Sequence, residues 1–81
     1  MAGHIDCTII APDATRFKGP VLQLTVSDSR GRMQLWPQHA EAFVALRTGE
    51  IVLRRPDNTD VSIPVTGGVL HLKDDVAKIV L

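Results

Sequence analysis

Apolar residues recur at every second position along most of the chain, and this alternation limits the possible fold more than any other feature. The alternating apolar residues are Ile5, Cys7 and Ile9; Leu22, Leu24 and Val26; Ile51 and Leu53; Val61, Ile63 and Val65; and Leu70 and Leu72. Successive side chains of a β-strand point to opposite faces, so this period predicts half-buried strands. Short turn-forming stretches such as "APDA", "SDSRG" and "RPDNTD" separate the runs. Many short strands with tight turns predict an all-β sandwich or barrel with mostly antiparallel pairing.

Three local features refine this prediction. The segment "HAEAFVAL", His39–Leu46, is the only helical candidate, and we expect at most one helical turn before it extends into a strand. Pro64 has no amide N–H to donate to a ladder, so its strand should lie at a sheet edge or carry a bulge. Gly67–Gly68 is predicted to form a turn or a bulge where strands reverse, and Asp74–Asp75 is predicted to form a turn.

Length and charge exclude several classes of protein. Eighty-one residues allow one domain, residues 1–81. Nine basic and nine acidic residues give no net charge, which disfavours a nucleic-acid partner. The single cysteine, Cys7, cannot form an internal disulfide and is expected to be buried. No apolar run is long enough for direct membrane insertion, and "MAGHIDCT" lacks the features of a signal peptide, so we expect a reducing, cytosolic location.

The residues of this chain indicate no catalytic, metal or cofactor site. His4, His39 and His71 show no metal-ligand spacing, and no cysteine pair accompanies them. No serine lies in a G-x-S-x-G elbow, and the glycine doublet belongs to no phosphate-binding motif. Arg54–Arg55 is interpreted as a solvated strand end. We therefore expect no catalytic residue, no metal and no cofactor.

The segment "LWPQHA" forms a predicted stiff corner. Pro37 restricts its own φ and favours extended geometry at Trp36, so a strand should end there and turn through Gln38 and His39. One interpretation is that Trp36 closes the end of the sandwich, because tryptophan is usually mostly buried. The other is a protein-binding rim, since a rigid corner lowers the entropic cost of binding. The rim residues would be Met33, Leu35, Trp36 and His39.

The order of five motifs resembles the ε subunit of rotary, F-type ATP synthases. The motifs are "FKGPV", "LWPQHA", "ALRTGEIVL", "VTGGVLHL" and "DVAKIVL". They are similar to that family's F-S-G-x-V, G-I-L-P-G-H-A, A-L-x-x-G, S-G-G and N-x-V-x-V-L segments, in the same order. The resemblance implies a ten-stranded antiparallel β-sandwich or flattened barrel, the N-terminal domain of that subunit.

The resemblance also implies a mechanical function and two partners. The domain would be a non-catalytic central-stalk subunit of a proton- or sodium-translocating ATP synthase, at the cytoplasmic face of a bacterial inner membrane. It would couple the γ subunit to the membrane c-ring. The candidate c-ring contacts are Arg32, Leu35, Trp36, Pro37 and His39. The candidate γ contacts are Val21, Val52 and Val69, whose phase in their strands is expected to direct them to an outer face.

The chain departs from the family pattern at a few positions. Gln38 replaces a glycine, so a positive φ there would be costly. Arg32 replaces a common glutamate, which suits a ring with acidic loops, and Glu41 replaces a proline. The chain stops at Leu81, so the functions of the family's helical hairpin are not assigned to it.

Two other functions stay open from the residues alone. The first is a generic adaptor sandwich that binds another protein through an edge strand and has no role in ATP synthesis. The second is a small enzyme or ligand carrier with a pocket near His39, which requires a concave cavity containing polar groups.

Overall fold

The computed structural model describes residues 3–81, and these residues form nine strands and no helix. The strands are β1 (Ile5–Ile10), β2 (Thr15–Val21), β3 (Gln23–Asp28), β4 (Gly31–Leu35), β5 (Ala42–Leu46), β6 (Gly49–Arg54), β7 (Asp60–Val65), β8 (Gly68–Lys73) and β9 (Val76–Val80). Residues 1 and 2, which begin the segment used to predict that no signal peptide is present, lie outside the described residues. The predicted all-β fold in one domain-sized sandwich is confirmed.

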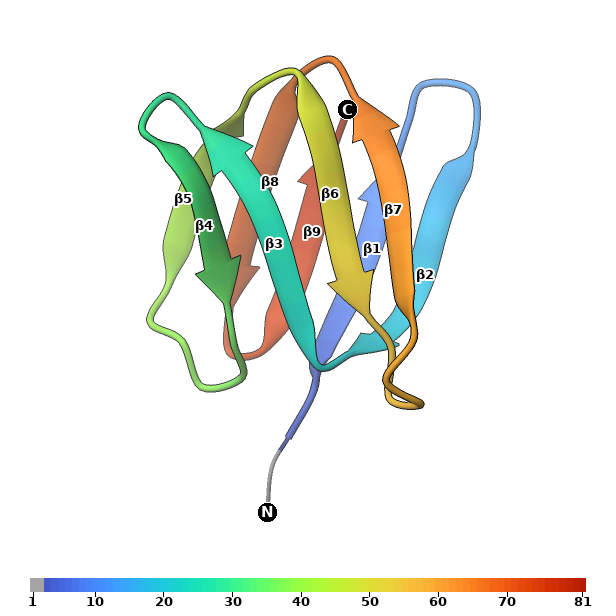
Figure 1. Ribbon diagram of the computed structural model, residues 1–81, viewed down its shortest axis with the longest axis vertical. Coiled ribbons are helices and arrows are strands. Elements are labelled where there is room, and N and C mark those ends of the chain that lie inside the picture. The colour runs from blue at the N-terminus through green and yellow to red at the C-terminus, as the bar shows by residue number, and fades with distance from the viewer. Residues whose placement is uncertain (1–2) are drawn as a thin grey trace.

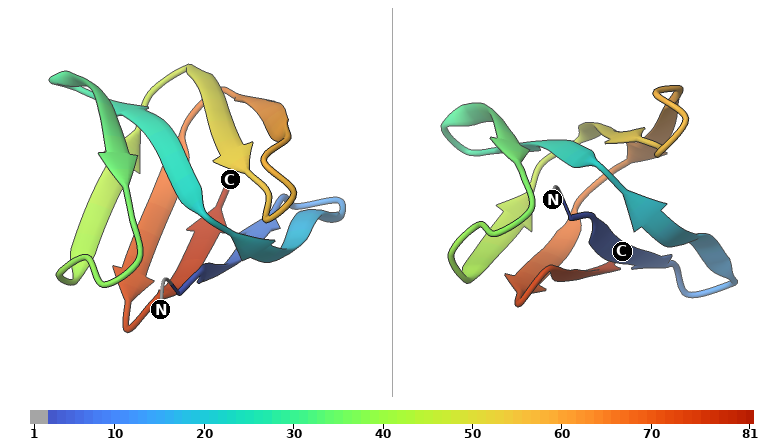
Figure 2. Two further views of the ribbon diagram at one scale, coloured as in Figure 1. Left: turned by 60° about the horizontal axis from the view of Figure 1, so that its bottom comes forward. Right: turned by 90° about the horizontal axis from the view of Figure 1, so that it is seen from below.

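The strands form two sheets that face each other (Figures 1 and 2). One sheet has five strands in the order β2-β1-β9-β8-β5, and the other has four in the order β4-β3-β6-β7. Neighbouring strands are antiparallel except β1 and β9, which run parallel. A parallel pair needs a long connection, and here nearly the whole chain lies between its two members.

The number of strands in residues 3–81 is one fewer than the ten that the resemblance implies. The longest connection between two consecutive strands is 36–41, between β4 and β5. Pro37 in this connection lacks an N–H, and Gln38 has a φ of 67°. Neither residue fits a regular ladder. The segment His39–Leu46 forms no helical turn, because Val44 and Leu46 point into the core while Phe43 and Ala45 point outward, as in a strand.

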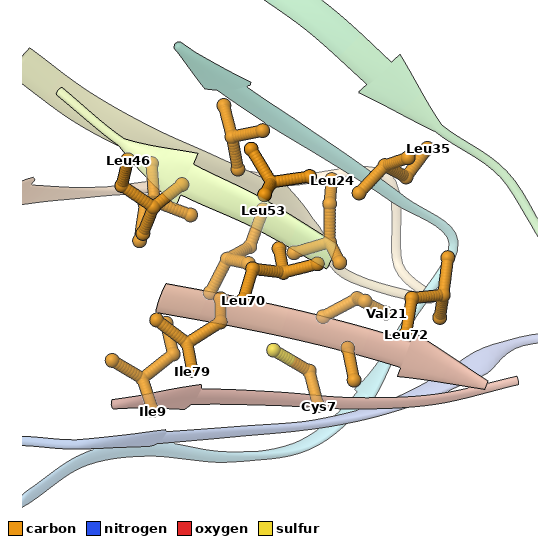
Figure 3. Packing of buried hydrophobic residues seen from close by; sticks show 14 of the residues in the cluster. Cys7, Ile9, Val21, Leu24, Leu35, Leu46, Leu53, Leu70, Leu72 and Ile79 are labelled. Atoms are coloured by element: carbon orange, nitrogen blue, oxygen red, sulfur yellow. The ribbon is translucent and has the colours of Figure 1, made fainter. Parts of the chain in front are cut away.

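The core lies between the sheets and is entirely apolar apart from one thiol. Figure 3 shows side chains from both sheets meeting there, including Leu24 and Leu53 from one sheet and Ile9, Leu70 and Ile79 from the other. The Cys7 thiol lies among them and is 1% exposed. Burial raises the pKa of Cys7 to about 12, because the thiolate would lose its hydration. The predicted burial of Cys7 is confirmed.

The edge position predicted for Pro64 and the turn predicted at Asp74–Asp75 are confirmed, whereas Gly67–Gly68 lies in a connection between the two sheets in which Gly68 already belongs to β8. Pro64 lies on β7, an edge strand of the four-stranded sheet. Gly67 and Gly68 connect β7 to β8 with φ angles of 152° and 135°. Asp74 and Asp75 form the tight turn between β8 and β9.

Candidate functional site

The predicted corner is built from two connections at one end of the sandwich. β4 ends at Leu35, and residues 36–41 lead to β5 on the opposite sheet. In Figure 1 this loop and the β8–β9 turn both lie at the lower end of the molecule. A hydrogen bond joins them: the Gln38 amide N–H donates to Asp75 Oδ1 at 2.6 Å. We call residues 36–41 together with Asp74 and Asp75 the corner.

Two neighbouring candidate residues, Leu35 and Trp36, differ in burial where β4 meets the corner. Leu35 is fully buried and belongs to the core, so its predicted place on a contact surface is wrong. Strand alternation is the reason, since Leu35 shares the inward phase of Met33 on β4. Trp36 takes the opposite phase and is 52% exposed. The interpretation in which Trp36 closes the end of the sandwich therefore fails, and half of the indole faces solvent.

The backbone of the corner has an unusual conformation. Gln38, Asp74 and Asp75 have φ angles of 67°, 52° and 61°, in the left-handed region that side chains other than glycine rarely adopt. The expected cost at Gln38 is therefore present in the structure. Pro37 precedes Gln38 in the same turn, and His39 follows it, exposed, with its Nδ1 at 2.7 Å from the Ala40 carbonyl.

A polar and aromatic cluster continues from the corner onto β5 and β8. His71 Nε2 lies 2.8 Å from Glu41 Oε2, and the His71 ring stacks on Phe43 with centroids 4.2 Å apart. The hydrogen bond with His71 lowers the pKa of the Glu41 carboxyl. This cluster was not predicted, because Glu41 and His71 are thirty residues apart and only the β5–β8 pairing brings them together.

Arg32 lies on β4, the edge strand that leads into the corner, but its side chain is away from the corner. Four residues of extended strand, about 13 Å, separate it from Trp36. Its side chain lines a groove of about 610 Å³ on the outer face of the four-stranded sheet. The groove also contains Gln23, Gln34, Val52 and the ion pair of Arg54 with Asp60, whose Nε–Oδ1 distance is 3.0 Å.

The three candidate γ contacts do not share one surface. Val21 is fully buried, so its predicted exposure on an outer face is wrong; it follows the phase of Phe17 and Gly19, whose partners on β1 point inward. Val52 faces outward on the four-stranded sheet, and Val69 faces outward on the five-stranded sheet. The two remaining valines therefore lie on opposite sides of the sandwich.

Val69 belongs to an apolar row that was not predicted as a unit. It pairs with Val80 and Ala45, and Val80 pairs with Ile10, so the row crosses β5, β8, β9 and β1. Ile10, Val69 and Val80 are 37%, 54% and 52% exposed. The alternation marks each of these side chains as outward-facing, but the pairing that aligns them comes from distant parts of the chain.

Among residues 3–81, no group of three or more histidine, cysteine, aspartate or glutamate side chains is arranged to hold a metal ion. The described part of the chain also contains no helix that could cross a lipid bilayer. A surface hollow of about 500 Å³ lies beside His39, lined by corner residues and by Lys73. It is open and polar, and the sandwich interior is filled by the core.

Comparison with known protein families decides the relationship. Residues 4–81 match the model of the β-sandwich domain of the ATP synthase δ/ε chain. The chain belongs to this family. This is the family of the ε chain, a non-catalytic subunit of ATP synthase.

Individual relatives of the δ/ε family agree with this assignment. The ATP synthase ε chain of Leptospira borgpetersenii serovar Hardjo-bovis is 30% identical over 78 residues, which cover 96% of this chain and 61% of the relative. The ε chain of Stenotrophomonas maltophilia strain K279a is 23% identical over 75 residues, covering 93% of this chain and 54% of the relative. The chain thus spans about half the length of such curated relatives.

Solved structures share the fold. A chain in the mitochondrial ATP synthase of Euglena gracilis, in an OSCP/F1/c-ring structure, superposes with a TM-score of 0.91 at 22% identity, covering 99% of this chain and 51% of that one. A chain of the central stalk and c-ring of the Tetrahymena thermophila enzyme gives a TM-score of 0.78 at 14% identity, covering 94% and 61%. These superpositions show that the chain shares the fold of chains in two ATP synthase structures.

Proposed function

We propose that this domain couples the γ subunit to the c-ring of a proton- or sodium-translocating rotary ATP synthase, at the cytoplasmic face of a bacterial inner membrane. It transmits torque by being held on two sides and performs no reaction. The observation that carries the proposal is the separation of two exposed surfaces on one rigid body. The corner lies at one end of the sandwich, and the apolar row lies on the outer face towards the other end.

The corner suits contact with the ring. Trp36, Pro37 and His39 are accessible on a loop that a long-range hydrogen bond holds in place. A preorganised loop loses little entropy on binding, and a half-exposed tryptophan can become a strong contact residue once a partner covers it. Arg32 lies on β4, about 13 Å of extended strand from Trp36, and offers a guanidinium that suits acidic ring loops beyond the corner.

The apolar row suits γ. Three branched aliphatic side chains stand side by side on a sheet face that no other part of the described chain covers. Exposed apolar patches of this kind mark protein-binding surfaces. Of the candidate γ contacts, Val69 lies in this row, whereas Val52 lies in the polar groove on the other side.

The test is reconstitution with separate γ and c-ring binding measurements. Replacing Trp36 and His39 together by alanine should weaken binding to the ring at least about tenfold and leave γ binding unchanged. Far-UV circular dichroism should show an unchanged β-fold, because both side chains are exposed. Unchanged ring affinity in a folded double variant would rule out the corner as the ring contact.

A further inference from the structure

The β8–β9 turn contains a residue that its local conformation does not favour. Both central residues, Asp74 and Asp75, have positive φ, as in the two-residue hairpin turns that usually contain glycine at the second position. Asp75 occupies that second position at a φ of 61°. An aspartate at such a site is strained relative to glycine, and strain that persists in a fold is often compensated by a function of the side chain.

The Asp75 side chain makes a contact that glycine could not make. Its Oδ1 accepts the hydrogen bond from the Gln38 amide at 2.6 Å, across thirty-seven positions of sequence. A carboxylate acceptor makes a stronger hydrogen bond to an amide than a neutral acceptor does. Gln38 itself has a φ of 67°, so this bond holds a residue that would otherwise favour a different conformation.

The Asp75 backbone anchors this contact to the rigid part of the molecule. Its carbonyl accepts the Asp6 amide at 2.8 Å, where the parallel pairing of β1 and β9 begins. The carboxylate therefore joins the loop 36–41, which connects the two sheets, to the β8–β9 turn of the five-stranded sheet. The hydrogen bond of His39 Nδ1 with the Ala40 carbonyl, by contrast, stays within the loop.

We infer that Asp75 is the positioning residue of the corner: its carboxylate fixes Gln38 and thereby presents Trp36 and His39 in a binding-ready conformation. The inference rests on the proposed function for its consequence in binding. Its structural half, that Asp75 immobilises the loop, stands independently of the partner.

Glycine substitutions separate this role from a role in turn formation. Asp75→Gly relieves the strained φ and removes the acceptor, so the hairpin stays folded while the loop is released. Asp74→Gly relieves the same kind of strain and leaves the Gln38 bond intact, which makes it the matched control. Asp75→Asn keeps a side-chain oxygen acceptor at the same place and should restore most of the wild-type behaviour.

Two measurements report on the loop directly. Hydrogen exchange of the Gln38 amide should become at least about tenfold faster in Asp75→Gly and stay unchanged in Asp74→Gly. The chain has one tryptophan, so time-resolved fluorescence anisotropy reports on Trp36 alone, and it should show increased local motion only in Asp75→Gly. Equal behaviour of the two glycine variants would overturn the inference.

Binding to the c-ring then tests the consequence. Asp75→Gly should lose affinity roughly fivefold or more, and Asp75→Asn should recover it. If Trp36→Ala/His39→Ala weakens ring binding but Asp75→Gly does not, the positioning role is wrong. If none of these variants changes ring binding while Asp75→Gly still releases the loop, the proposed function fails and the structural role of Asp75 stands.

Discussion

Leu35 and Trp36 are neighbours in the chain but have opposite roles in the molecule. Leu35 fills the core between the sheets, and Trp36 stands half-exposed at the start of the corner. The alternating geometry of β4 directs consecutive side chains to opposite sides, so one residue contributes to stability and the next is available to a partner. Cys7 also lies in the core, where its polarizable thiol packs as a small apolar side chain does.

Alanine substitutions at these two neighbours should therefore differ sharply. Leu35→Ala removes a fully buried side chain and should reduce the free energy of unfolding by about 2–5 kcal/mol. That loss is a large fraction of the total for so small a domain. Trp36→Ala should cost no more than about 1 kcal/mol. Urea unfolding followed by circular dichroism measures both, and similar losses for the two variants would contradict the assigned environments.

Burial of Cys7 predicts a loss of stability at alkaline pH. The pKa rises from 9.0 in the unfolded chain to about 12 in the fold. The thiolate therefore forms more readily in the unfolded state. The protonated thiol's contribution to the free energy of unfolding is complete below pH 9 and is lost as the pH rises from 9 towards 12. The loss is about 1.4 kcal/mol for each pH unit in this window. Cys7→Ala removes this dependence, so the difference between the two pH profiles isolates the thiol. A constant difference from pH 8 to 11 would contradict it.

At the scale of elements, the connections decide where the sheets meet. β7 passes to β8, and so from one sheet to the other, through Gly67 and Gly68. A Cβ atom at Gly68 would lie 2.6 Å from the Val80 carbonyl oxygen, a backbone atom of β9. The close approach of β8 and β9 thus needs glycine for space as well as for its φ of 135°.

This double requirement distinguishes Gly68 from Gly31. Gly31→Ala meets no atom within 4 Å and suffers only from its φ of 122°, so it should cost about 1–2 kcal/mol. Gly68→Ala should cost about 1–3 kcal/mol more, because the backbone of β9 must move. Thermal unfolding of the two variants measures the difference. Equal melting temperatures would show that β9 yields without cost.

At the scale of the whole molecule, the sandwich presents two unlike outer faces. The four-stranded sheet carries a polar groove with Arg32, Arg54 and Asp60, and the five-stranded sheet carries the apolar row. The corner lies at one end, where loops of both sheets meet (Figures 1 and 2). A body with distinct surfaces on different sides can contact two partners at once, which the proposed function requires.

The two outward valines test which face γ contacts. Val69→Lys places a charge in the apolar row and should weaken association with γ at least about tenfold. Val52→Lys is the matched control on the opposite face and should change the affinity less than about threefold. Isothermal titration with purified γ measures both. A larger effect of Val52→Lys would assign γ to the polar groove instead.

Sequence alone determined the alternating strands β1, β3, β6, β7 and β8, the inward phase of Ile9 and Leu70, the edge position of Pro64 and the turn at Asp74–Asp75, because each follows from local alternation or from the chemistry of one or two residues. The ordered motifs added the family. Only the tertiary structure decided that Leu35 and Val21 are buried, that Val52 and Val69 lie on opposite faces, and that Asp75 reaches Gln38. These facts depend on which strands pair and in which register, and pairing between distant segments is set by the packing of the whole core rather than by neighbours in the chain.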